Sequence, residues 1–189
     1  DVGSGGCWWS NSGDSIDSTL FRQVDLTIAT AATINYQVWF DLEESWDYAY
    51  LEVSTDGRLP SSIIATSHTF SANPIGNAYG PGYTGKSSGW LQESVDLGEY
   101  LGDEVWLRFQ YITDDAVNGP GLCVRDLSLD VEGAPADAHE WVASGFIYID
   151  NRVPQDYIVQ LIQSGDRNAV LQVELDSRNS GQITIERPQ

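Results

Sequence analysis

The stretch DLEESWDYAYLEVSTDG, residues 41–57, combines two patterns that decide how this chain folds. In its second half, Ala49, Leu51 and Val53 recur at every other position along YAYLEVS, and this period of two is typical of a half-buried β-strand. Its first half, DLEESWD, crowds carboxylates directly before that strand. The stretch therefore predicts a strand that the chain enters through an acidic loop.

The same alternation recurs along the first two thirds of the chain. Further strand candidates are 33–40, 90–97, 104–113 and 122–131, with Glu93 as a polar exception on the apolar face of its segment. Turn-forming clusters such as TDGRLP and NPIGNAYGPGYTG separate these candidates, and a helical period is almost missing. Many short strands at this spacing predict an all-β chain that folds as an antiparallel jelly-roll β-sandwich.

The alternating pattern breaks at residues 134–140, which are small, polar and Pro-containing and are typical of a linker. We therefore predict a sandwich domain over 1–133 and a small four-stranded β unit over 141–189. The candidate strands of this last unit are 144–150, 157–163, 169–176 and 182–188. So small a sheet is marginal alone, and it must pack on the first domain, on another neighbour or on another copy.

The charge of the chain limits its partners. It has 28 acidic and 9 basic residues, which gives a formal net charge of −19. Such a chain repels nucleic acid and anionic membranes, and no apolar run approaches the length of a membrane span. We expect neither a nucleic-acid partner nor a membrane span. The chain starts at Asp1 without a signal-peptide pattern, so we expect a mature product, a processed fragment or a trimmed domain.

The sequence contains two cysteines, Cys7 and Cys123. An even number of cysteines fits an exported protein with one disulfide bridge. A bridge between these two would close a loop of over a hundred residues. In the chain-entropy model such a loop stabilises the fold by roughly 4–5 kcal/mol, less any strain. Two buried free thiols are the alternative.

The sequence lacks the common catalytic motifs. Its two histidines, His68 and His139, do not belong to an H-E-x-x-H helix, and no G-x-S-x-G, Walker or dinucleotide motif is present. A glycosidase needs only two suitably spaced carboxylates, but no suitable histidine or nucleophile stands beside the acidic clusters. We therefore expect that this chain is not an enzyme.

Acidic residues gather in three segments at predicted strand ends, SNSGDSID (10–17), EESWD (43–47) and TDDAVNGPGLCVRD (113–126). Calcium takes about six to eight oxygen ligands from carboxylates, carbonyls and amides, and three loops can supply them if the fold brings the loops together. The spacing is not that of an EF-hand. The clustering predicts bound calcium, and solvated, mutually repelling surface loops are the alternative.

The aromatic residues have two interpretations. Trp8, Trp9, Trp46 and Trp90, together with several tyrosines, could line a carbohydrate-binding face. They could equally form the core and rim of the sandwich, where large aromatic side chains most often lie. We favour the core.

Four segments, in this order, resemble one family: WWSNSGDSIDSTLFRQVDL, WFDLEESWDYAYLEVSTDG, NPIGNAYGPGYTGKSSGWLQESVDL and LRFQYITDDAVNGPGLCVRDLSL. They are similar to the region after the catalytic domain in immune inhibitor A-like (M6) metallopeptidases. The resemblance covers residues 7 to about 131 and is strongest in WDYAYLEVSTDG and VNGPG. It implies a jelly-roll sandwich similar to MAM-type and carbohydrate-binding modules, in a secreted, extracellular protein. The tail GFIYIDNRVPQDYIVQLI is similar to the segment C-terminal to this module in those secreted peptidases.

The resemblance also implies a set of calcium ligands. Carried onto matching positions, they are Asp14, Asp17, Glu44, Asp47 and Asp126, with Asp114 and Asp115 as adjacent candidates. The chain departs from the family pattern at one of them, because Arg125 stands where another acid is common. The guanidinium of Arg125 could therefore be the partner of Asp126 in place of calcium.

In jelly rolls of this kind the first and last strands are neighbours, so the resemblance implies that Cys7 and Cys123 lie within reach of a bridge. A second departure from the family concerns catalysis. The peptidase domain with its zinc motif is not in this sequence, so these residues cannot hydrolyse a substrate through that zinc.

Three functions remain as hypotheses. The first is a non-catalytic, calcium-binding accessory module of a secreted protein, which supports or targets a catalytic domain of its parent. The second is an extracellular subunit that assembles with copies of itself into filaments or layers by strand addition and calcium. The third is a carbohydrate-binding module that stacks exposed Trp and Tyr rings on sugars.

Overall fold

The computed structural model describes most of the chain and divides it into two compact units, Asp1–Ile149 and Asp150–Gln189. The described residues are 5–55, 57, 61–135, 139–150, 170–175 and 181–186, the last two segments as backbone only. Almost every regular element among them is a strand, and the exception is a single 3₁₀ turn, η1 (Gly98–Tyr100). No helix in the described part of the chain is long and apolar enough to cross a membrane.

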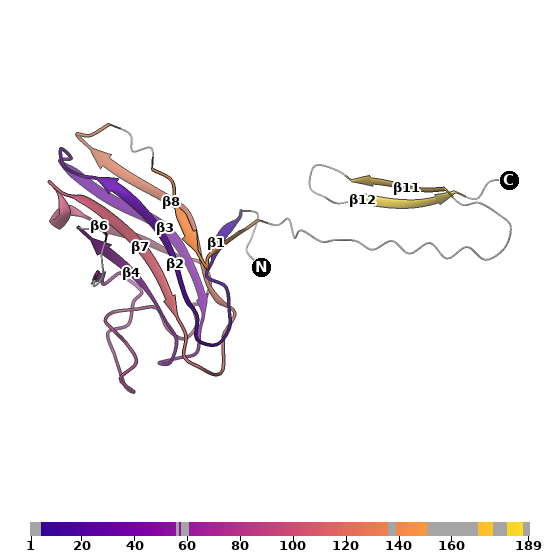
Figure 1. Ribbon diagram of the computed structural model, residues 1–189, viewed down its shortest axis with the longest axis horizontal. Coiled ribbons are helices and arrows are strands. Elements are labelled where there is room, and N and C mark those ends of the chain that lie inside the picture. Colours follow the sequence, from indigo (N-terminus) through magenta and orange to yellow (C-terminus); the bar gives the residue numbers. More distant parts are fainter. Residues whose placement is uncertain are drawn as a thin grey trace. The chain divides into compact units, whose positions relative to one another are not determined.

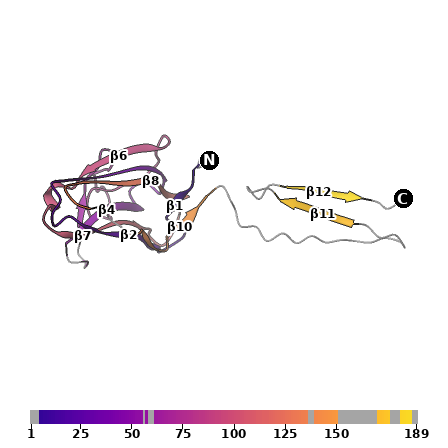
Figure 2. The ribbon, with the colours of Figure 1, turned by 90° about the horizontal axis from the view of Figure 1, so that it is seen from above.

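The first unit is a sandwich of two five-stranded sheets (Figures 1 and 2). One sheet has the order β10 (Ile147–Ile149), β1 (Cys7–Trp9), β8 (Gly121–Glu132), β3 (Ala31–Asp41) and β6 (Leu91–Asp96). The other has the order β5 (Ser62–Ile64), β4 (Tyr48–Ser54), β7 (Glu104–Ile112), β2 (Asp17–Asp25) and β9 (Val142–Ser144). All of these strands pair antiparallel. The prediction of an all-β, antiparallel sandwich is confirmed.

The core lies between the inner faces of the two sheets. On β3 every second residue from Ala32 to Phe40 is buried, and on β7 the same holds from Val105 to Tyr111. The two rows meet where the ring of Tyr36 packs edge-on against Phe109, with centroids 5.0 Å apart. Burial of each large apolar side chain stabilises the fold by about 1.5–3 kcal/mol. The period of two predicted these inward faces.

Strand β4 differs from the half-buried strand that its alternation predicts, because it is buried on both faces. Tyr48 and Tyr50 are buried as fully as their inward-facing neighbours. Their rings stack with centroids 6.0 Å apart. The phenol oxygen of Tyr50 accepts the backbone N–H of Tyr79 at 3.1 Å. A long loop therefore covers the outer face of β4, which alternation alone could not indicate.

The predicted boundary between the units also changes. Strand β9 pairs with β2 and β10 pairs with β1, so both belong to the sandwich. The ring of Trp141 packs near Phe109, with centroids 5.8 Å apart. The division therefore falls after Ile149 and not at the predicted linker 134–140, because the chain returns to add one edge strand to each sheet.

The second unit contains two described strands, β11 (Val170–Leu175) and β12 (Gly181–Glu186), which pair antiparallel. They correspond to the candidates 169–176 and 182–188. The candidate 144–150 is β10 of the sandwich, and the candidate 157–163 lies outside the described residues.

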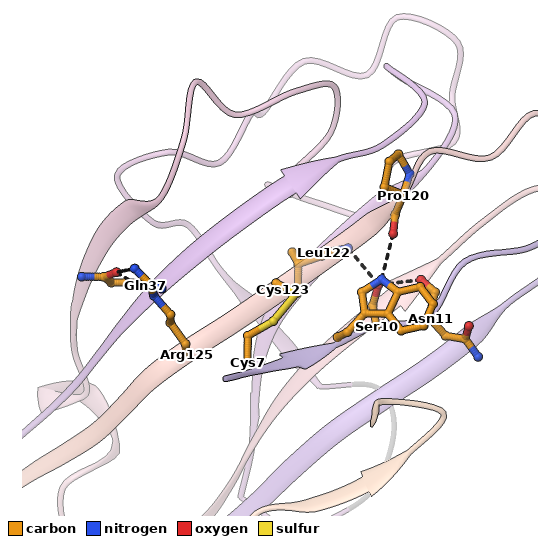
Figure 3. Close-up of a disulfide and its surroundings, with 9 residues drawn as sticks. Cys7, Ser10, Asn11, Gln37, Pro120, Leu122, Cys123 and Arg125 are labelled. Carbon is orange, nitrogen blue, oxygen red and sulfur yellow. Dashed lines mark hydrogen bonds between the residues drawn. A yellow bond between two sulfur atoms is a disulfide. The ribbon is translucent and has the colours of Figure 1, made fainter. Parts of the chain in front are cut away.

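Cys7 and Cys123 form a disulfide with their Cα atoms 5.7 Å apart (Figure 3). The bridge joins β1 to β8, which pair through Trp8 opposite Val124. Beside it, the Ser10 hydroxyl accepts the backbone N–H of Leu122 at 2.9 Å. The predicted disulfide, and the predicted pairing of the first and last strands of the sandwich, are confirmed.

Replacement of both cysteines by serine should lower the free energy of unfolding by about 2–5 kcal/mol, because the bridge closes a loop with a sequence separation of 116 residues. Urea unfolding of the double variant, compared with the oxidised parent chain, measures this difference. Equal stability of the two proteins would show that the bridge does not constrain the unfolded chain.

Candidate metal centre

Three acidic loops meet at one end of the second sheet. The last residue of β7, Ile112, pairs with Tyr48 at the start of β4 on one side and with Asp17 at the start of β2 on the other. The loops before β4, after β7 and before β2 must therefore emerge together. The backbone N–H of Ser15 donates to the carbonyl of Asp114 at 2.6 Å, which joins the early loop to the loop after β7.

Three carboxylates converge at this end of the sheet, those of Glu43, Asp47 and Asp114. One carboxylate oxygen from each lies within 4.8 Å of the others. The backbone N–H of Asp47 donates to the carbonyl of Glu43 at 3.1 Å, and the N–H of Asp114 donates to Oδ1 of Asp47 at 3.2 Å. Backbone hydrogen bonds thus hold three like charges side by side.

Asp47 is fully buried, whereas Glu43 and Asp114 are half-buried. Burial is the largest cause that raises the pKa of Asp47, to about 6; the charges of Asp114 and Glu43 add to the rise, and backbone hydrogen bonds from Asp114 and Glu43 oppose it. Its second oxygen, Oδ2, finds no hydrogen-bond partner among the described residues. An ionised carboxylate in this state is destabilising unless a cation joins it.

Tyr111 sits beside this carboxylate. Burial raises the pKa of its hydroxyl, and the charge of Asp47 raises it further. The hydroxyl and Oδ2 of Asp47 do not meet the distance and angle of an ordinary hydrogen bond, and neither has another partner in the described part of the chain. Two polar atoms are thus buried beside each other without a well-formed hydrogen bond, a situation that is rare in native proteins.

Two other buried carboxylates show how the same fold satisfies a charge from within. Oε2 of Glu52 accepts Nε of Arg108 at 2.7 Å and also a second guanidinium nitrogen. Glu93, which is fully buried, accepts hydrogen bonds from hydroxyl and backbone groups of Thr66, Ser67, His68 and Tyr83. Only Asp47, among the buried acids that the structure describes, keeps a buried oxygen without a hydrogen-bond partner.

The structure brings together Asp47 and Asp114 from the predicted ligand set and adds Glu43. Glu44, which precedes Ser45 in the same turn, lies against Gly85 instead. Sequence reasoning noted Glu43 in the acidic cluster but chose its neighbour. The sequence signal for Glu43 is its spacing of four residues from Asp47, which places the two residues over each other in a helical turn. The structure shows this turn as a hydrogen bond from the N–H of Asp47 to the carbonyl of Glu43.

The other predicted ligands lie outside the group of three. Asp14 accepts the side-chain amide of Asn118, and Asp17 accepts that of Gln110 at 2.7 Å. Asp115 is exposed. The loop that carries Asp14 nevertheless lies close to the three carboxylates, because the backbone N–H of the neighbouring Ser15 donates to the carbonyl of Asp114.

Asp126 lies on the first sheet, away from the group, at a β-bulge. The register of β3 and β8 shifts between Asn35 and Gln37, and Asp126 takes the left-handed conformation, with φ of 52°. Its side chain is exposed, and its Oδ2 lies 3.6 Å from Nε of Arg125. Arg125, the residue that departs from the family pattern, therefore contacts Asp126 through its guanidinium on the same strand.

A sequence model of the immune inhibitor A-like MAM domain matches residues 3–148. The chain belongs to this family. The match ends within β10, one residue before the end of the first compact unit, so this MAM domain corresponds to that unit. The predicted resemblance to the immune inhibitor A-like family is confirmed.

Curated relatives of this MAM domain are larger proteins. The pre-pro-metalloprotease PrtV of Vibrio cholerae serotype O1 is 32% identical over 126 residues, which are 67% of this chain and 13% of that protein. Immune inhibitor A of Bacillus thuringiensis subsp. alesti is 27% identical over 128 residues, 67% of this chain and 17% of that protein. Bacillopeptidase F of Bacillus subtilis is 24% identical over 101 residues, 53% of this chain and 6% of that protein. The chain thus spans less than a fifth of each.

Asp47 should make the metal-free MAM domain less stable as pH rises. Its folded pKa of about 6 exceeds its ordinary value of 3.8, so the folded state holds the proton more tightly than the unfolded chain. The resulting stability is complete below about pH 4 and is lost as pH rises through 6, by on the order of 3 kcal/mol.

The measurement is urea unfolding in EDTA at several pH values for the parent chain and for Asp47→Asn, which cannot ionise at this position. The parent should lose stability relative to the variant between pH 4 and 7. A constant difference across this range would show that Asp47 does not titrate there.

Proposed function

We propose that this MAM domain is a calcium-stabilised, non-catalytic accessory module of a secreted protein. The observation that carries the proposal is the buried carboxylate of Asp47, with one oxygen unpartnered, between the half-buried carboxylates of Glu43 and Asp114. A divalent cation among them would compensate three like charges and supply the missing partner of Asp47.

The donor set favours a hard cation. All three side chains offer oxygen, and the group contains neither the histidine nor the cysteine that zinc sites use. Three carboxylates supply between three and six oxygens, and backbone carbonyls or water can provide the rest. Calcium accepts such flexible, irregular sites, whereas magnesium requires near-ideal octahedral geometry. Calcium is therefore the ion that these residues fit best.

The ion would act as a structural link. Glu43 and Asp47 belong to the turn that enters β4, and Asp114 belongs to the loop that leaves β7. These two strands pair along their whole common length, from Tyr48 opposite Ile112 to Ser54 opposite Trp106. An ion at their shared end would fasten the two loops and leave the sheet unchanged, which is the role of a stabilising site.

Two observations support an accessory role in a secreted parent protein. The relative PrtV is a pre-pro-metalloprotease of which this chain covers only a small part, so a catalytic domain elsewhere in the parent is the partner that we propose. The Cys7–Cys123 disulfide fits an oxidising compartment.

Millimolar extracellular calcium would also fill a weak site, since extracellular modules bind calcium with dissociation constants of about 10⁻⁴–10⁻³ M.

The edges of the sandwich give little support to assembly by strand addition. Three of its four edge strands, β5, β9 and β10, are only three residues long. Short edges offer few free backbone groups to a neighbouring strand. We therefore do not propose self-assembly as the function of this domain.

Calcium should raise the thermal midpoint of the chain, and EDTA should abolish the rise. If the dissociation constant is near 0.1 mM, 10 mM calcium stabilises the folded state by about 2.7 kcal/mol. Asp47→Asn should lose this gain, because it removes the buried charge while keeping the shape of the side chain. Asp126→Asn is the matched control and should keep it, because Asp126 is exposed and lies on the other sheet.

Differential scanning calorimetry of the three proteins, each with calcium and with EDTA, measures these effects. The calcium proposal fails if the parent melts at the same temperature in both conditions. It fails equally if Asp47→Asn gains as much from calcium as the parent does.

A further inference from the structure

A cleft of about 290 Å³ lies next to the candidate metal centre. Its walls come from the turn before β4, from the ends of β4 and β7, and from the loop around Gly76. The side chains that matter for binding are those of Trp46, Tyr50, Asn77, Tyr79 and Asp114. Asp114 belongs both to the cleft and to the group of three carboxylates, so the two features are continuous.

Two aromatic rings in the cleft are open to solvent. Trp46 is 46% exposed and Tyr79 is 74% exposed, although large aromatic side chains are mostly buried on average. Tyr79 packs against Tyr50 with ring centroids 6.1 Å apart, and Tyr50 stacks in turn on the buried Tyr48. The exposed ring of Tyr79 thus stands on a rigid aromatic base.

The loop that carries Tyr79 is held in place before any ligand arrives. The side chain of Asn73 both donates to the carbonyl of Ala78 and accepts its N–H, each at 3.0 Å. The next N–H, that of Tyr79, donates to the phenol oxygen of Tyr50 at 3.1 Å. Further along, Phe70 and Gly82 exchange backbone hydrogen bonds. A preformed wall loses little conformational entropy on binding.

The chemistry of the walls selects the ligand. Apolar ring faces are combined with the amide of Asn77 and the carboxylate of Asp114, and no lysine or arginine is among the described residues that line the cleft. The net charge of −19 disfavours nucleotides, whose bases could otherwise stack on the same rings. A pyranose ring has apolar C–H faces that pack on aromatic rings and hydroxyls at its edge that bond to amide and carboxylate groups.

We propose that this cleft binds a neutral saccharide, with a sugar ring against Trp46 and Tyr79 and its hydroxyls on Asn77 and Asp114. Ligand sites occupy roughly 300–1,000 Å³, and a cleft of about 290 Å³ is at the lower limit of that range. It therefore accommodates one or two sugar units and not a long polymer along its whole length. Such binding would direct the catalytic partner to glycan-bearing material.

The proposal rests on the proposed calcium function in one respect. An ion held by Glu43, Asp47 and Asp114 would immobilise the turn that carries Trp46 and one side of the cleft. It would also compensate the negative charge that otherwise favours a basic ligand over a neutral one. Saccharide binding should therefore be strongest with calcium present.

The test uses the full chain on a printed array of neutral glycans that end in hexose, N-acetylhexosamine or deoxyhexose, and then calorimetric titration with the best binder. We expect saturable binding in 2 mM calcium with a dissociation constant of about 0.1–1 mM. Tyr79→Ala and Trp46→Ala should each weaken it at least tenfold. Tyr148→Ala is the matched control, because Tyr148 is also an exposed aromatic (54%) but lies on β10 of the other sheet.

The outcomes separate the two proposals. A calcium-dependent rise in thermal midpoint without binding to any glycan would overturn the saccharide site and leave the metal centre intact. Glycan binding that is equal in calcium and in EDTA would uphold the cleft and overturn its coupling to the ion. Binding of a tetralysine peptide that Tyr79→Ala abolishes, with no glycan bound, would show that the cleft recognises a basic ligand and would refute the assigned class.

Discussion

The burial of Asp47 at the entrance to β4 is the constraint on which the functional end of this domain depends. Three carboxylates are buried among the described residues of the sandwich, and two of them receive hydrogen bonds from the protein itself, Glu52 from a guanidinium and Glu93 from hydroxyl and backbone donors. Asp47 accepts the backbone N–H of Asp114 and faces two further acids. The fold supplies such donors to the other two carboxylates and not to Asp47, which is why we propose a cation at this position.

Antiparallel pairing is what assembles this site. Because β7 lies between β4 and β2, its last residue fixes where both neighbouring loops begin, and acids far apart in the sequence arrive at one place. The same arrangement sets the aromatic cleft beside the acids, since Trp46 and Asp47 are consecutive in the chain. The proposed ion site and the proposed saccharide cleft would thus share one end of the second sheet. The disulfide joins β1 to β8 in the first sheet.

Much of the fold was predictable, and the failures have specific causes. Alternation identified the inward faces of β3 and β7, because a strand between core and solvent repeats every two residues. It misjudged β4, whose outer face a distant loop covers through Tyr79. It also divided the chain too early, because β9 and β10 are three-residue edge strands with little pattern of their own.

By itself the sequence determined the all-β class, the inward faces of the long strands, the acidic character of the loops and the family, because these depend on local periodicity, composition and motifs. Only the tertiary structure decided which acids meet. Glu43 and not Glu44 turns toward Asp47, and a bulge keeps Asp126 beside Arg125 on the other sheet. The physical reason is that convergence depends on strand register and on the direction of each side chain, which long-range pairing sets and local sequence does not.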